Sequence, residues 1–135
     1  MKKLICAHFA MAILGLSGLA HAATEDAVHV MAISSEVAIE GGEAHTHATV
    51  ILRIRDLGPE KDVGIVLNTP EGDSYRPGIY AGTAEYGYEI WKVDTDFPGE
   101  ETVDFLGVHR IGRATYIDDN QGAFYSFKVT PLAIH

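Results

Sequence analysis

The chain has 135 residues, with 10 basic and 19 acidic side chains and a formal net charge of −9 at neutral pH. A chain of this length suits one domain with a modest core, and its acidic balance disfavours nucleic acid and anionic membrane surfaces, whose phosphates it repels. The charge is compatible with a neutral ligand, a cation or a basic protein partner.

Residues 1–22 have the pattern of a secretory signal peptide. Lys2 and Lys3 precede an apolar run over residues 4–20, and Ala20-His21-Ala22 supplies a small-x-small cleavage site. The run is shorter than the roughly 20 apolar residues that span a bilayer. We predict a periplasmic or secreted protein with no membrane association after cleavage, in which residues 23–135 form a single domain. A retained N-terminal anchor is the alternative.

Alternation of apolar and polar residues predicts β-strands along the rest of the chain. We expect strands at residues 28–33, 50–55, 63–67, 86–93, 102–110, 114–117 and 124–129. Turns are expected at residues 39–43 and at Ile111-Gly112, and residues 68–82 are expected to be rich in loops. About seven short strands separated by turn signals predict an all-β, antiparallel β-sandwich.

No pattern typical of a catalytic centre is present in the sequence. Gly-x-Ser-x-Gly, the phosphate-binding loop and His-Glu-x-x-His are all missing, and the single cysteine, Cys6, lies in the leader. Carboxylates are numerous, but their spacing marks no acid/base pair. We therefore predict a protein that is not an enzyme, has no cofactor and has no disulfide in its mature domain.

His45 and His47 form the sharpest metal-binding pattern in the chain. Residues two apart on a strand point to one face, so both imidazoles would project together. Glu43, His29 or His109 would have to complete the ligand set. Two exposed polar residues on a strand explain the same pattern. A metal-binding protein that uses His45 and His47 remains one alternative.

Aromatic residues gather in the second half of the chain, in or next to predicted turns. Rings at the rim of a β-sandwich can stack on the apolar faces of sugars, while neighbouring amides and carboxylates bond the hydroxyls. Trp91 and Tyr125 are expected in the core because each shares a strand face with apolar residues. Tyr75 and Tyr86 lie in predicted loops and are freer to act as platforms.

The order of features over residues 50–129 resembles carbohydrate-binding module family 21. This family includes the starch-binding module of fungal glucoamylase and the glycogen-targeting module of protein phosphatase regulatory subunits. The stretches that carry the resemblance are residues 50–63, 88–91 ("YEIW"), 103–110 ("VDFLGVHR") and 115–127 ("TYIDDNQGAFYSF"). The last is similar to the family's signature, an aromatic pair followed by Asp-Asn-Asn and a closing Asn-Tyr.

The resemblance implies an immunoglobulin-like β-sandwich that binds α-glucans such as starch or glycogen without cleaving them. Its partner would be a polysaccharide or oligosaccharide. The residues expected to bond sugar hydroxyls are Asp118, Asp119, Asn120 and Gln121. The candidate stacking rings are Tyr75, Tyr86, Tyr116 and Tyr125.

The signature stretch departs from the family pattern at three positions. Ile117 stands where a second stacking ring is usual, Asp119 replaces an Asn, and Phe124 stands where an Asn is common. A stacked ring contributes about 1 kcal/mol or more. A secreted structural or protein-interaction β-sandwich that has lost the sugar site is therefore the second alternative.

Overall fold

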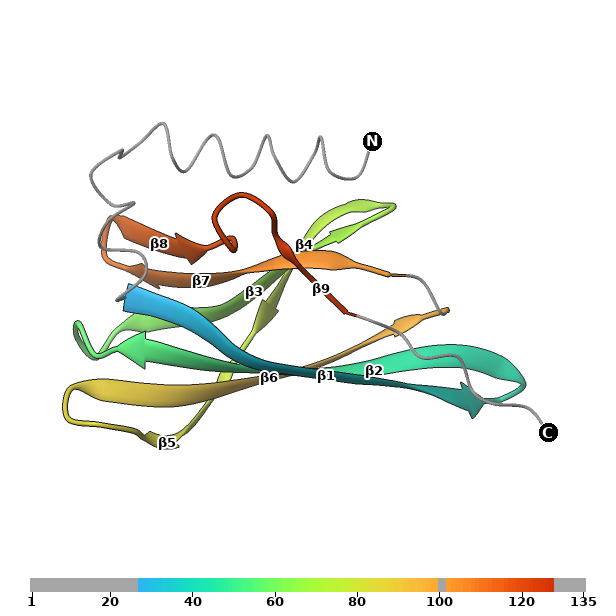
Figure 1. Ribbon diagram of the computed structural model, residues 1–135, viewed down its shortest axis with the longest axis horizontal. Coiled ribbons are helices and arrows are strands. Elements are labelled where there is room, and N and C mark those ends of the chain that lie inside the picture. Colours follow the sequence, from blue (N-terminus) through green and yellow to red (C-terminus); the bar gives the residue numbers. More distant parts are fainter. Residues whose placement is uncertain (1–26, 100–101, 128–135) are drawn as a thin grey trace.

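The computed structural model describes residues 27–99 and 102–127. These residues form nine strands in two antiparallel sheets, which face each other as the layers of a β-sandwich (Figure 1). Sheet A has the order β1-β2-β6-β5, with β1 at Val28–Glu40, β2 at Glu43–Arg55, β5 at Ile79–Thr83 and β6 at Tyr88–Pro98. Sheet B has the order β4-β3-β7-β8, with β3 at Lys61–Thr69, β4 at Gly72–Pro77, β7 at Asp104–Ile111 and β8 at Ala114–Asp118, and β9 at Tyr125–Ser126 pairs with β7. The predicted all-β antiparallel sandwich is confirmed.

The β1–β2 hairpin is longer than the sequence pattern indicated. Each strand has 13 residues, whereas alternation predicted only residues 28–33 and 50–55. Gly41 and Gly42 form the turn with φ angles of 60° and 82°, and two positive φ angles are what a tight type I′ hairpin turn requires. Further along the hairpin, a register shift between Val30 and Ala32 places the buried Val28 and Val30 opposite the buried Ile54 and Leu52.

The prediction of a loop-rich stretch at residues 68–82 is wrong, because β4 and all of β5 except Thr83 lie within it. Both are edge strands, so Pro77, which has no N–H to donate, ends β4 without breaking a central ladder. The chain passes from sheet B to sheet A at Gly78. The β7–β8 turn lies at Gly112-Arg113 and not at the predicted Ile111-Gly112. The last strand, β9, covers only Tyr125–Ser126 of the predicted residues 124–129, of which residues 128–129 lie outside the described residues.

The main core lies between the two sheets. Its fully buried side chains include Val28, Val50, Leu52, Ile54, Val63, Ile65, Leu67, Val93, Phe105 and Phe127. The rings of Phe105 and Phe127 stack with centroids 4.5 Å apart. At Gly107 an added Cβ would lie 3.2 Å from Val30 Cγ2 and 3.3 Å from Leu52 Cδ2, so glycine allows the sheets to approach closely.

Sheet B is apolar on its outer face as well. Val66, Leu106, Val108 and Ile117 alternate with the core residues and form a second buried cluster, against which Phe124 packs. This contact holds the loop between β8 and β9 against sheet B. Within the part of the chain that the structure describes, no helix is long and apolar enough to cross a membrane.

Candidate functional site

The last residue of β8 and the loop between β8 and β9 contain the four residues that were expected to bond sugar hydroxyls, Asp118, Asp119, Asn120 and Gln121. Asp118 Oδ2 accepts hydrogen bonds from the Val30 N–H and the Tyr125 hydroxyl, both at 2.8 Å. Asp119 is buried, and its Oδ1 accepts a hydrogen bond of 3.1 Å from the Gly122 N–H. Both carboxylates therefore stabilise the loop itself.

The exposed part of this loop consists of two amides in a strained backbone. Asn120 and Gln121 both have φ of 56°, and Phe124 has φ of 59°, which are backbone angles that residues other than glycine rarely adopt. Asn120 Nδ2 donates a hydrogen bond of 3.2 Å to the Phe124 carbonyl oxygen. Gln121 is exposed beside it. The loop thus presents little beyond these two side chains.

The predicted stacking rings Tyr116 and Tyr125 pack against the main core. Tyr125 stacks on Phe105 with centroids 5.7 Å apart. Burial, followed by the hydrogen bond to Asp118, raises the pKa of the Tyr125 hydroxyl. Tyr116 lies with its ring centroid 6.0 Å from that of His109. Both rings are only half-exposed, so neither stands free as a sugar platform.

Tyr75 and Tyr86 are exposed, as their loop-like sequence context indicated, but they lie apart. Tyr75 is on β4 at one edge of sheet B, whereas Asn120 follows β8 at the opposite edge. Tyr86 is fully exposed in the turn between β5 and β6, in the other sheet. The structure therefore does not bring the predicted ligand-binding residues together in one cluster.

His45 and His47 lie half-buried on β2, two residues apart as predicted. His47 Nε2 is 3.0 Å from Glu40 Oε2 on β1, which makes Glu40 its partner. Across residues 27–99 and 102–127, no three side chains of His, Cys, Asp or Glu gather in a group that could hold a metal ion.

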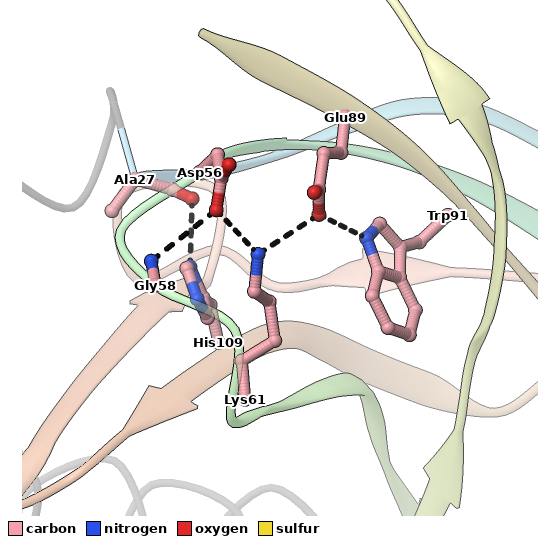
Figure 2. Close-up of polar contacts among 7 residues, drawn as sticks. All are labelled: Ala27, Asp56, Gly58, Lys61, Glu89, Trp91 and His109. Atoms are coloured by element: carbon pink, nitrogen blue, oxygen red, sulfur yellow. Dashed lines mark hydrogen bonds and ion pairs between the residues drawn. The ribbon is translucent and has the colours of Figure 1, made fainter.

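A different polar cluster, which the sequence did not reveal, meets where β2, β3 and β6 come together (Figure 2). Lys61 on β3 places its Nζ 2.8 Å from Asp56 Oδ1 and 3.0 Å from Glu89 Oε1. Glu89 Oε1 also accepts a hydrogen bond of 2.9 Å from the Trp91 indole N–H. We call Asp56, Lys61, Glu89 and Trp91 the corner cluster.

Electrostatics favour the charged forms of Lys61 and Asp56. The Lys61 side chain is only 5% exposed, and although burial alone would lower its pKa, the hydrogen bonds and charges of Asp56 and Glu89 outweigh burial and raise it. The hydrogen bond from Lys61, followed by that from the Gly58 N–H, lowers the pKa of Asp56. One ammonium is therefore fixed between two carboxylates.

Local sequence explains how three segments reach this corner. Glu89 and Trp91 are two residues apart on β6 and so share one strand face. Asp56 follows β2, and its Oδ1 accepts a hydrogen bond of 3.2 Å from the Gly58 N–H, an Asx turn that leads the chain back to Lys61 at the start of β3. The spacing Glu89-x-Trp91 was the one sequence signal that could have found the cluster.

Two shallow concavities flank the corner cluster and share Asp56 and Glu89. One, of about 400 Å³, is lined by Asp56, Gly58, Pro59, Lys61, Glu89 and Trp91. The other, of about 300 Å³, runs over residues 83–89 and Asp56 and so includes the exposed Tyr86. Exposed Tyr80 meets Trp91 edge to face, with centroids 6.0 Å apart. Fixed charges beside aromatic rings suit a neutral, hydroxyl-rich ligand.

Comparison with solved structures places this fold in a known class. The starch binding domain of Rhizopus oryzae glucoamylase, in complex with beta-cyclodextrin and maltoheptaose, matches with a TM-score of 0.59 at 14% identity over 76% of this chain and 93% of that chain. The carbohydrate binding module of the muscle glycogen-targeting subunit of Protein Phosphatase-1 matches with a TM-score of 0.50 at 13% identity over 73% of each chain.

The fold is therefore the immunoglobulin-like β-sandwich of the family 21 carbohydrate-binding modules, and the resemblance stated from the sequence is confirmed as a likeness of structure. No protein-family model matches the sequence, and no curated protein matches it.

Proposed function

We propose that this protein is a non-catalytic carbohydrate-binding protein that holds an α-glucan at the corner cluster. The observation that carries the proposal is the Lys61 ammonium fixed between Asp56 and Glu89, beside Trp91 and the fully exposed ring of Tyr86. The two structurally similar proteins are a starch binding domain and a glycogen-targeting module, and the first holds beta-cyclodextrin and maltoheptaose. These similarities make a neutral α-glucan the first ligand to test.

The chemistry of the corner cluster suits binding. Asp56 and Glu89 accept hydrogen bonds from sugar hydroxyls, Lys61 holds both carboxylates in place, and the Tyr86 ring offers a face for stacking. Since Asp56 and Glu89 line both concavities, two consecutive sugar units would contact the cluster. We therefore expect affinity to rise from glucose to maltose.

The same cluster is poorly suited to glycoside hydrolysis. A glycosidase needs one protonated carboxylic acid to give a proton to the leaving group. Lys61 holds Asp56 ionised, and Glu89 Oε1 accepts hydrogen bonds from both Lys61 and Trp91. Neither carboxyl is placed as a general acid, which supports a binding role.

Retention on polysaccharides tests the proposal. Residues 23–135 should be retained on insoluble starch and glycogen but not on cellulose or chitin, and Tyr86→Ala should weaken retention. If neither starch nor glycogen retains the protein, α-glucan binding is wrong, and the protein-interaction sandwich becomes the better account. Ile117 supports this alternative, because it stands where the family signature has a stacking ring and is buried in the second apolar cluster.

We also propose that the protein is exported and loses residues 1–22. The basic start, the apolar run and Ala20-His21-Ala22 support this processing. The mass of the protein isolated from the producing cells should correspond to a chain that begins at Ala23. An intact N-terminus on the isolated protein would contradict export by this route.

A further inference from the structure

His109 is a buried titratable residue beside the corner cluster that sugar binding does not use. It lies on β7, fully buried, and its Nδ1 is 3.2 Å from the Ala27 carbonyl oxygen (Figure 2). A carbonyl oxygen can only accept, so Nδ1 carries the proton of the neutral ring. Nε2 is then the basic nitrogen, and it is buried without a hydrogen-bond partner.

The charged groups around His109 are those of the corner cluster. Figure 2 shows Lys61 on β3, Glu89 on β6 and Asp56, which follows β2, in the same corner as His109, and their charges act on its pKa. Its direct neighbours in sheet B, Val63 on β3 and Tyr116 on β8, add no ammonium or carboxylate. Burial is the main cause that lowers the His109 pKa; the Ala27 bond and the two carboxylates oppose it, and Lys61 adds to it.

A proton on Nε2 would disturb this arrangement. It would create a buried cation and a donor with no acceptor, a state that costs free energy unless a carboxylate moves to meet it. The nearby carboxylates are already bound to Lys61. Rotation of the ring towards solvent would break the bond to Ala27, which leads into β1. Imidazolium and ammonium would therefore compete for the same carboxylates.

We propose that His109 is a proton-sensitive positioning residue of the corner cluster, whose protonation draws Asp56 away from Lys61 and weakens sugar binding in acid. The effect on sugar rests on the proposed function. The rearrangement of the cluster does not, so it can be tested without a ligand.

The chain has a single tryptophan, Trp91, which lies in the cluster and reports on it. In residues 23–135 we expect Trp91 fluorescence to change as pH falls below 6.5, the ordinary histidine pKa, because burial lowers the pKa of His109. His109→Gln keeps an amide that can donate to Ala27 but cannot titrate, so this change should disappear. His47→Gln, at a surface histidine paired with Glu40, is the matched control and should titrate like wild type.

A wild-type signal that stays flat in this range, or one that persists unchanged in His109→Gln, overturns the proposal. A second measurement needs no variant. In nuclear magnetic resonance titrations, the ring protons of His109 and the indole N–H of Trp91 should shift with one shared midpoint. Different midpoints for the two groups would contradict the coupling.

Binding of beta-cyclodextrin at pH 7 and at a pH below the midpoint of the fluorescence transition tests the consequence for the site. Wild-type affinity should fall several-fold in acid, while the affinity of His109→Gln should change little. An equal loss of affinity in wild type and His109→Gln would show that His109 does not cause the pH dependence, and it would overturn the proposal. No binding at either pH, together with an intact fluorescence transition, means that the proposed function fails while the proton-sensitive cluster stands.

Discussion

The loop between β8 and β9 and the corner cluster are both rich in carboxylates, but they use them differently. In the loop, Asp118 and Asp119 accept hydrogen bonds from the backbone and from Tyr125, so they hold the chain in shape. In the corner, Asp56 and Glu89 bind Lys61 and line two concavities beside exposed rings. A polar signature thus marks a turn as readily as a site, and the difference between these two regions is that the corner carboxylates line concavities.

Asp118→Ala should have the largest effect on the fold. It leaves the Val30 N–H and the Tyr125 hydroxyl without their acceptor, and we expect a loss of about 3 kcal/mol in the free energy of unfolding. Urea denaturation measures this loss, with Asp96→Ala at an exposed position of β6 as the control. A loss no greater than that of the control would mean that Asp118 does not hold the loop.

Lys61→Met should cost less stability but abolish sugar binding. Glu89, 17% exposed, loses its ammonium, whereas the half-exposed Asp56 is rehydrated, so we expect a loss of about 2 kcal/mol. Urea denaturation and retention on starch measure the two effects. A variant that unfolds like wild type and is still retained would show that the corner cluster serves neither stability nor binding.

The corner cluster should weaken at both ends of the pH scale. The raised pKa of Lys61 gives stability that is present below 10.5 and is lost as pH rises through the higher folded value. The lowered pKa of Asp56 gives stability that is lost as pH falls from 3.8 towards the lower folded value, in addition to any loss that protonation of His109 brings at higher pH. The difference in melting temperature between wild type and Lys61→Met should shrink beyond both limits. A difference in melting temperature that does not change with pH would show that the ion pairs of Lys61 do not contribute to stability.

Tyr86→Ala should separate binding from stability. Because the ring is fully exposed, the free energy of unfolding should change by less than about 0.5 kcal/mol. Loss of a stacking face should weaken maltoheptaose binding about fivefold, which corresponds to about 1 kcal/mol. Calorimetry measures the affinity, and Tyr75→Ala on the edge of sheet B is the matched control, expected to bind like wild type. The opposite pattern would place the glucan on sheet B.

Gln121→Gly should have the smallest effect. Glycine adopts the φ of 56° without steric cost, so we expect a gain of about 0.5 kcal/mol in the free energy of unfolding and unchanged sugar affinity. Thermal unfolding and calorimetry measure both quantities. Weaker sugar binding by this variant would show that the loop between β8 and β9 contacts the sugar.

The sandwich was predictable because alternation marks a half-buried strand wherever one face is apolar and the other polar. Alternation did not predict β4 and β5, because these edge strands tolerate Pro77 and Gly82 and their apolar pattern is weak. Alternation also could not show that sheet B is apolar on both faces. Val66 and Leu106 belong to continuous apolar runs, in which apolar and polar residues do not alternate.

The candidate site was harder to predict than the fold. Tyr86 was singled out because a ring in a turn is free of the core, and the structure exposes it. The Asp118–Gln121 signature is local in sequence and so was easily seen, but it gives no information on which oxygens are already bound. Lys61 and Glu89 are 28 residues apart, and their contact depends on how sheet A packs over sheet B.

One measurement tests the central claim most directly, namely that the corner cluster and not the β8–β9 loop holds the glucan. Maltoheptaose is added to nitrogen-labelled residues 23–135, and the indole N–H of Trp91 is followed together with the side-chain amides of Asn120 and Gln121. We predict a saturable shift of the Trp91 indole resonance with both amides unchanged. A shift of the Asn120 and Gln121 amides with the indole unchanged would contradict this account.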